Sequence, residues 1–181
     1  MAAGPRRPAR TLVQSALMVR ATRPALFLVL LAVAASGCGP RVDVKQALQV
    51  TDVSTGWFDA GIVDGKNKLV PHVSFRVKNT SGETVSSVQL NAVFRVVGDV
   101  QELGSMFVRG IGPEGLAAGQ STEVFALQSS LGYTADPPQT RLQMLQHDQF
   151  QDAQVEIFAK PGSGQWVKLA EYKIDRQLLT K

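Results

Sequence analysis

Two stretches of the sequence alternate apolar and polar residues, and this alternation limits the fold more than any other feature. In residues 69–78, Val73, Phe75 and Val77 alternate with polar side chains. Residues 85–97 repeat the pattern with a longer apolar row, Val88, Leu90, Ala92, Phe94 and Val96. Successive side chains of a β-strand point to opposite faces, so each stretch predicts a strand with one buried and one solvated face. We therefore expect Phe75 and Phe94 in the core.

Turn signals divide the rest of the chain into further short strands. Asp-Gly at residues 64–65 is typical of a hairpin turn. The segments between such turns predict five more strands, at residues 41–53, 101–109, 121–128, 155–160 and 166–174. Gly104 and nearby charges favour an edge position for the strand at 101–109. Apolar residues of both parities indicate that the strand at 121–128 is covered on both faces.

Two segments leave alternatives open. Residues 41–53 are rich in β-branched residues, which favours a strand with an irregularity near Gln46, but a helix over residues 43–49 is the alternative. Residues 129–151 are the least regular part and predict a loop with one helical turn, marked by Leu142 and Leu145. About seven strands without a long helical pattern indicate an all-β, antiparallel sandwich.

The two alternating stretches carry a resemblance as well. The sequence PHVSFRVKNTSGETVSSVQLNAVFRVVGD, followed by the turn GLAAGQS and the next strand, resembles the immunoglobulin-like sandwich of small bacterial envelope domains, the FxLYD type among them. The resemblance covers about residues 69–128 and lacks the Leu-Tyr-Asp that names the FxLYD family. It implies a fold but no functional residue, because one fold serves many functions.

An apolar run at residues 25–35 follows five arginines and no acidic residue. At about 11 residues it is too short for a membrane-spanning helix, which needs roughly 20, and is typical of a secretion signal. The signal ends in Ala35-Ser36-Gly37 before Cys38, the only cysteine. This resembles the lipobox of bacterial lipoproteins, with Ala35 where leucine is usual. The resemblance implies cleavage before Cys38 and its acylation; the alternative is an ordinary secretion signal with an incidental cysteine.

The signal sets the expected boundaries of the chain. We expect a signal peptide, a lipidated tether, a β-sandwich domain and a tail, at residues 1–37, 38–41, 42–176 and 177–181. The segment before the apolar run is long for a signal, so Met18 offers a shorter start. In the lipoprotein family, Asp after the acylated cysteine commonly favours the inner membrane. Gly39 stands there, which indicates the outer membrane, with the domain facing the periplasm.

The net charge of +4 belongs to the signal. The chain from Cys38 onward has 14 basic and 15 acidic residues, so its net charge is −1. Without a basic run it lacks the electrostatic signature of a nucleic-acid-binding protein, and we expect no nucleic acid among its partners. Its single cysteine allows no internal disulfide, so the apolar core alone must hold the fold.

The sequence contains only poor matches to catalytic or metal-binding motifs. Residues 110–115 match G-x-G-x-x-G, but no helix pattern follows, so the match indicates a loop rather than a dinucleotide site. His72 and His147 are too few to form a zinc site. Asp148 and Asp152 lack the spacing of a calcium loop. We therefore expect no metal, no cofactor and no enzymatic activity; an enzyme using scattered carboxylates is the alternative in another class.

Three aromatic residues, Trp57, Phe58 and Trp166, are candidates for contacts with a partner. The alternative is that they belong to the core or its edge. We predict a monomeric, lipid-anchored envelope lipoprotein with a binding or scaffolding role, attached to the membrane through acylated Cys38 and contacting an envelope protein. A structural adaptor subunit of an envelope assembly or transport machine is the alternative function.

Overall fold

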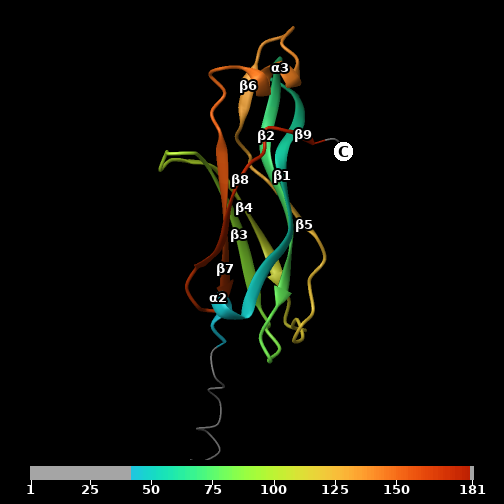
Figure 1. Ribbon diagram of the computed structural model, residues 1–181, viewed down its shortest axis with the longest axis vertical. Coiled ribbons are helices and arrows are strands. Elements are labelled where there is room, and N and C mark those ends of the chain that lie inside the picture. The colour runs from blue at the N-terminus through green and yellow to red at the C-terminus, as the bar shows by residue number, and fades with distance from the viewer. Residues whose placement is uncertain (1–41, 180–181) are drawn as a thin grey trace, which may run out of the picture. The chain divides into compact units, whose positions relative to one another are not determined.

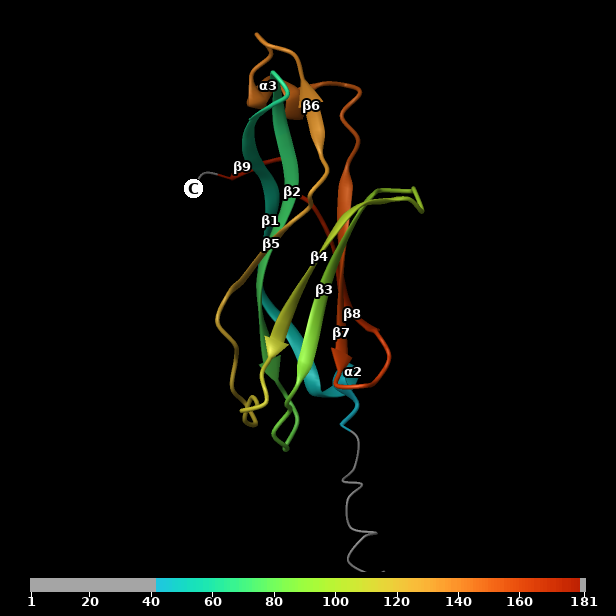
Figure 2. The same ribbon diagram turned by 180° about the vertical axis from the view of Figure 1, so that it is seen from behind.

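Two β-sheets pack face to face in the computed structural model, which describes residues 42–179 (Figure 1 and Figure 2). The described residues contain nine strands and two short helices. The sequence thus predicted the class correctly, a mostly β sandwich, but missed two short strands. The predicted signal, Cys38 and the tether lie outside the described residues.

The first sheet is built around a long hairpin. Strand β1 (Leu48–Val63) pairs antiparallel with β2 (Lys66–Asn79). Two short strands, β5 (Phe125–Gln128) and β6 (Tyr133–Ala135), pair with different parts of β2, and β9 (Leu178–Leu179) runs parallel to β1. Residues 178–179, in the segment expected to be a tail, therefore pair with the first sheet.

The turn between β1 and β2 follows from its two residues. Asp64 and Gly65 both have positive φ angles, 51° and 77°. A two-residue hairpin turn of this kind matches the right-handed twist of the flanking strands, and it needs residues that tolerate positive φ. The predicted Asp-Gly turn is confirmed.

The second sheet has the order β4-β3-β7-β8. Its strands are β3 (Val88–Val96), β4 (Glu102–Ile111), β7 (Ala153–Pro161) and β8 (Val167–Lys173). All neighbours in this sheet are antiparallel. Strand β4 lies at an edge, as predicted from its charges and Gly104.

The core lies between the two sheets and confirms the predicted alternation. Phe75 of β2 and Phe94 of β3 are fully buried. The apolar row of β3 pairs with the buried row of β7, since Ala92 lies opposite Ile157 and Phe94 opposite Val155. Residues 42–179 contain no cysteine, so no disulfide can stabilise the described domain. Burial of apolar area is therefore the main source of its stability.

The segment before β1 is a short helix, α2 (Val44–Ala47). The side chain of Asp43 accepts a hydrogen bond from the Lys45 N–H and caps the helix. Val44 and Ala47 are buried on the same helical face. The prediction of a strand from residue 41 is therefore wrong for these residues, and the alternative helix is correct in a shorter form.

Two further predictions need correction. The strand at 121–128 is only four residues long and has one buried face, with Leu127 buried and Val124 52% exposed. The predicted helical turn exists as α3 (Arg141–Gln146), but Leu142 is 57% exposed, whereas Met144 and Leu145 are buried.

A bulge in β8 changes the expected side of Trp166. Ile157 pairs with Ala170 but Phe158 pairs with Lys168, so the register skips Leu169. Strict alternation along the strand predicted at 166–174 would place Trp166 and Ala170 on one face, and the bulge breaks this alternation. Ala170 lies opposite the buried Ile157, whereas Trp166 packs beside Phe107 on the outer face.

Candidate functional site

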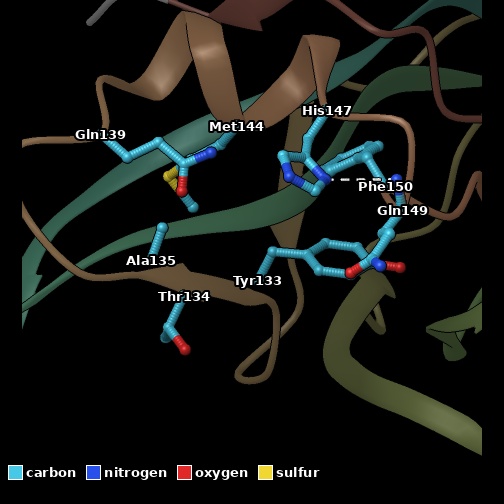
Figure 3. A pocket seen from close by; sticks show the side chains of 8 residues that line it. All are labelled: Tyr133, Thr134, Ala135, Gln139, Met144, His147, Gln149 and Phe150. Carbon is cyan, nitrogen blue, oxygen red and sulfur yellow. Dashed lines mark hydrogen bonds between the residues drawn. The ribbon is translucent and has the colours of Figure 1, made fainter.

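A pocket of about 330 Å³ lies where β6 and α3 meet (Figure 3). We call it the β6–α3 pocket. One continuous segment, residues 133–150, supplies all eight residues that line it: Tyr133, Thr134, Ala135, Gln139, Met144, His147, Gln149 and Phe150. The pocket is therefore a local structure, assembled as this segment folds against the sandwich.

Backbone pairing and capping hold the segment in place. Strand β6 pairs with the start of β2, with Tyr133 opposite Leu69. This approach needs Gly132, because a Cβ there would overlap the Leu69 carbonyl. Helix α3 begins with a capping box, in which Thr140 and Gln143 exchange side-chain-to-backbone hydrogen bonds.

A buried amide fixes the loop between β6 and α3. The Nδ2 of Asn67, in β2, donates to the Gln139 carbonyl at 2.6 Å. Because buried polar groups are costly to leave unpaired, this bond ties the loop to the first sheet. The Gln139 side chain itself lines the pocket.

Three aromatic rings form the floor of the pocket and the layer beneath it. The Tyr133 and Phe150 rings lie 4.5 Å apart, centre to centre, and both line the pocket. The fully buried Trp57 ring lies 4.7 Å from Phe150 and 5.4 Å from Tyr133. These separations are typical of aromatic packing that stabilises a core. The floor is therefore an extension of the core, and the Trp57 ring packs against both of its aromatic residues.

The rim is polar. The Nδ1 of His147 accepts the Gln149 backbone N–H at 3.2 Å, so an imidazole in this arrangement carries its proton on Nε2. Asp148 Oδ1 lies 3.1 Å from the same Nδ1 and would compete for it if Nδ1 were protonated.

The Tyr133 hydroxyl is already engaged. It donates to the Gln151 carbonyl at 3.1 Å. Burial raises the pKa of the Tyr133 phenol, an effect only partly offset by the hydrogen bond to Gln151 and by the positive charge of Arg176. Tyr133 therefore remains neutral over the whole physiological range.

The lining contains few groups of the kind that take part in catalysis. The eight residues include no carboxylate, lysine, arginine, serine or cysteine, so Thr134 has no acidic or basic group in the lining, other than His147, to activate it. Across residues 42–179, no group of three or more His, Cys, Asp or Glu side chains could hold a metal ion.

A second candidate lies on the outer face of the sheet β4-β3-β7-β8. Phe107, Phe158 and Trp166 gather there, and we call them the aromatic cluster. The Phe107 and Trp166 rings meet edge to face with centres 5.9 Å apart. Phe107 is 55% exposed and Trp166 is 40% exposed. Exposed large aromatics that pack on one another are typical of interaction surfaces.

Positive charge and an unpaired amide accompany the aromatic cluster. Lys160 Nζ lies 5.9 Å from the centre of the Trp166 ring, within the range of a cation–π contact. Arg109 lies opposite Gln89 on the same face as Lys160. Asn91 lies between Phe107 and Phe158 across the strands, and its buried Oδ1 has no hydrogen-bond partner in the part of the chain that the structure describes.

A groove of about 610 Å³ lies along the opposite sheet. Phe58 and the irregular part of β1 at residues 59–61 line one part of it, and Gln128, Leu178 and Leu179 line the other. Phe58 is half-buried, and its ring lies 6.4 Å from that of His72. Burial lowers the pKa of His72 below its ordinary value.

The predicted site residues are not brought together. Cys38 lies outside the described residues. Trp57 is fully buried beneath the β6–α3 pocket, so it is a core residue rather than a partner contact. Phe58 lines the groove on the first sheet, and Trp166 belongs to the aromatic cluster on the second.

The sequence interpretation missed Phe107, Phe158 and the whole β6–α3 pocket. The strand predicted at residues 101–109 was interpreted only as an edge strand, from its charges and Gly104, so the exposure of Phe107 was not considered. The sequence could have indicated this exposure, because Phe107 alternates with the polar residues Ser105 and Arg109 on the face of the strand that is exposed to solvent. The pocket had no such signal, because residues 133–150 have no regular period.

Neither helix within residues 42–179 is long and apolar enough to cross a membrane.

Comparisons with known proteins identify no family for this chain. No family model matches it, and no curated protein matches it. Several solved structures are similar in fold. AT1g01470 from Arabidopsis thaliana is 12% identical with a TM-score of 0.43, over 81% of this chain and 93% of that one. The structural genomics target SoR45 is 8% identical with a TM-score of 0.42, over 72% and 88%. The putative ApaA protein from Bordetella pertussis is 12% identical with a TM-score of 0.38, over 70% and 91%. None of these likenesses bears on function.

Proposed function

We propose that this chain is a lipid-anchored, non-enzymatic lipoprotein of the bacterial envelope, whose β-sandwich binds another envelope protein through its aromatic cluster. The sequence around Cys38 supports the anchor and a position in the outer membrane facing the periplasm. The observation that carries the binding role is the exposed pair Phe107 and Trp166 on a sheet face that faces solvent.

The strand order supports the finer part of the proposal, an immunoglobulin-like sandwich. In that fold one sheet holds strands A, B and E and the other holds C, F and G, with C′ beside C in some members. Taken in chain order, the neighbours β5-β2-β1 correspond to E-B-A, and β4-β3-β7-β8 correspond to C′-C-F-G.

A protein partner with acidic groups fits the aromatic cluster best. Aromatic residues dominate binding energy at protein interfaces, and they act best when surrounding polar contacts exclude water. Lys160 and Arg109 add positive charge beside the rings, so carboxylates on the partner would give charge complementarity.

Photo-crosslinking in intact cells tests this proposal. The full-length chain carries Phe107→p-benzoylphenylalanine, and a matched variant carries the same residue at the exposed Gln49 of β1. We expect one discrete adduct from position 107 and none from position 49. Charge reversal by Lys160→Glu should remove the adduct, whereas Lys45→Glu in α2 should leave it unchanged.

Several outcomes would contradict the proposal. These are no adduct at position 107, an adduct with a second copy of this chain, or an adduct that persists unchanged in Lys160→Glu. If the captured protein also copurifies at fixed stoichiometry in mild detergent, the role is that of an adaptor subunit within a larger machine.

The anchor has a separate test. Labelled fatty acid should be incorporated into the wild-type chain and lost in Cys38→Ser, which should also leave the membrane fraction or remain unprocessed. One acyl chain alone binds membranes only marginally, so stable anchoring implies more than one. Incorporation of label by Cys38→Ser would show that Cys38 is not the modified residue.

A further inference from the structure

We propose that the β6–α3 pocket binds one sugar residue of a neutral glycan. The pocket shares no residue with the aromatic cluster, so this site is additional to the proposed protein-binding surface. Its volume of about 330 Å³ is at the lower end of the range for small-molecule sites, which run from roughly 300 to 1,000 Å³. A ligand of one ring matches that size.

The floor matches one side of a sugar ring. A pyranose has a flat face of C–H groups and a rim of hydroxyls. Tyr133 is the partly exposed ring of the floor, and the buried Phe150 and Met144 pack beside it at the edge of the pocket (Figure 3). Trp57 packs behind Phe150 and keeps it in place. The C–H face of the sugar would therefore lie on a rigid aromatic surface, which lowers the entropy cost of binding.

The rim matches the hydroxyls. The side chains of Gln139, Gln149 and Thr134 can each donate and accept hydrogen bonds, as a hydroxyl can. His147 adds a donor at Nε2 while its Nδ1 accepts the Gln149 N–H. In Figure 3, His147 and Gln149 lie beside the two rings of the floor, whereas Gln139 lies next to Met144 and the Thr134 side chain points away from the rings.

The absence of charge from the lining selects against charged ligands. The eight residues include neither a carboxylate nor a lysine or arginine. A phosphate or carboxylate ligand would have to give up its hydration without a counter-charge in the lining, which is costly. The nearby Arg176, 5.2 Å from the centre of the Phe150 ring, is already paired with Asp152 at 2.6 Å. A neutral ligand carries no such cost.

The position of the pocket favours a glycan over a nucleoside, which is also a neutral ring ligand. Helix α2, the first described element, lies at the opposite end of the sandwich from α3 and β6 in both views (Figure 1 and Figure 2). This step rests on the proposed function: with Cys38 as the anchor, the pocket would be the end far from the membrane. There it would meet the glycan polymers of the envelope.

The full-length chain, purified in a zwitterionic detergent without sugar groups, allows a direct test. Maltose, N,N′-diacetylchitobiose and adenosine serve as probes. Saturation transfer from protein aromatic protons to the ligand, measured by NMR, reports both binding and stacking. We expect transfer strongest at the ring C–H protons of one of the two sugars, and a Kd on the order of 1 mM, as suits a single small ring.

Intrinsic fluorescence provides a second reading of the same site. The chain has two tryptophans, so Trp166→Phe leaves Trp57, behind the floor, as the only one. The sugar should change Trp57 emission with the same Kd as in the NMR titration.

Rim variants decide whether binding occurs in this pocket. The double variant Gln139→Ala and Gln149→Ala keeps the backbone bonds to Asn67 and His147, and it should weaken sugar binding at least tenfold. Gln146→Ala, exposed on α3 but outside the pocket, is the matched control and should leave binding unchanged.

Three results would overturn the inference: no saturable transfer to either sugar, binding of adenosine but not of sugars, or sugar binding that the double variant leaves intact. None of these results depends on acylation of Cys38 or on Phe107. Failure here and failure of the proposed protein-binding function are therefore separate outcomes.

Discussion

The inner and outer faces of the sheet β4-β3-β7-β8 are formed by the same four strands, but they carry different kinds of side chain. On the inner face, successive residues of β3 and β7 are buried and apolar. The outer face is divided into two halves. One half carries ion pairs and the other carries the aromatic cluster. Burial determines the inner row and, on the outer face, Val93 of β3. The exposed aromatic residues in one outer half therefore call for a reason other than folding.

In the ion-paired half of the outer face, charged side chains of neighbouring strands pair with one another. Glu156 accepts from Arg95 Nε at 3.1 Å and from Lys168 Nζ at 3.1 Å. Lys168 also contacts Glu171 at 2.8 Å, and Arg95 contacts Glu102 at 3.4 Å. These pairs bridge the four strands from one edge to the other. The aromatic half has the same geometry and could have carried such pairs too.

The largest expected effect contrasts two phenylalanines on neighbouring strands. Phe94→Ala opens a cavity in the core and should cost about 3–5 kcal/mol of unfolding free energy. Phe107→Ala, on the outer face of β4, should cost less than about 1 kcal/mol, since its side chain is largely exposed. Chemical denaturation of the full chain in detergent measures both. Equal losses would mean that Phe107 is a core residue and that the outer face has no special role.

The second prediction concerns Glu156, the central carboxylate of the ion-paired half. Burial alone would raise the pKa of Glu156, but hydrogen bonds from Lys168 and Arg95 outweigh burial and hold the pKa below its ordinary value. Its side chain is 15% exposed. Glu156→Gln should therefore cost about 1–2 kcal/mol at pH 7, as expected for charge-assisted hydrogen bonds.

The sign of the pH dependence follows from the lowered pKa. The contribution of Glu156 is fully present above the ordinary pKa of about 4.3 and is lost as pH falls through the lower folded value. The difference between wild type and Glu156→Gln should thus shrink in acid below about pH 4. Glu171→Gln, whose carboxylate is more exposed, should cost less than about 0.5 kcal/mol. A loss that stayed constant down to pH 2 would show that packing, rather than charge, explains Glu156.

The buried rows of this molecule could be predicted from the sequence because β2 and β3 are long and regular. Each keeps one buried parity over many residues, so Phe75 and Phe94 could be placed without a structure. Short elements could not be identified in this way. Strands β6 and β9 are three and two residues long and gain their backbone partners only from tertiary pairing.

The candidate sites depend on contacts between distant parts of the chain. Phe107 and Trp166 meet only because β3 and β7 place β4 and β8 on a common face, and a bulge at Leu169 turns Trp166 outward. Neither fact is visible in local periodicity. The β6–α3 pocket likewise depends on Asn67 holding the Gln139 loop, a bond across a long sequence separation.

The smallest expected effect tests the outer face of the other sheet. His72 lies on β2 beside Phe58, and burial lowers its pKa below the ordinary value of about 6.5. The unfolded chain therefore binds a proton at His72 more readily than the folded chain does. Stability should fall slightly as pH drops from about 7 through 6.5 toward the lower folded value, and then level off.

His72→Gln removes this titration and should flatten the decline in melting temperature between pH 7.5 and pH 5.5. Ser74→Ala, on the same face of β2 and without a titratable group, should retain the wild-type slope. Thermal melts of the full chain at several pH values measure both variants. An unchanged slope in His72→Gln would mean that the imidazole is as well solvated as in the unfolded chain. The outer face beside Phe58 would then be open to water, unlike the ion-paired half of the second sheet, where Glu156 is held by its neighbours.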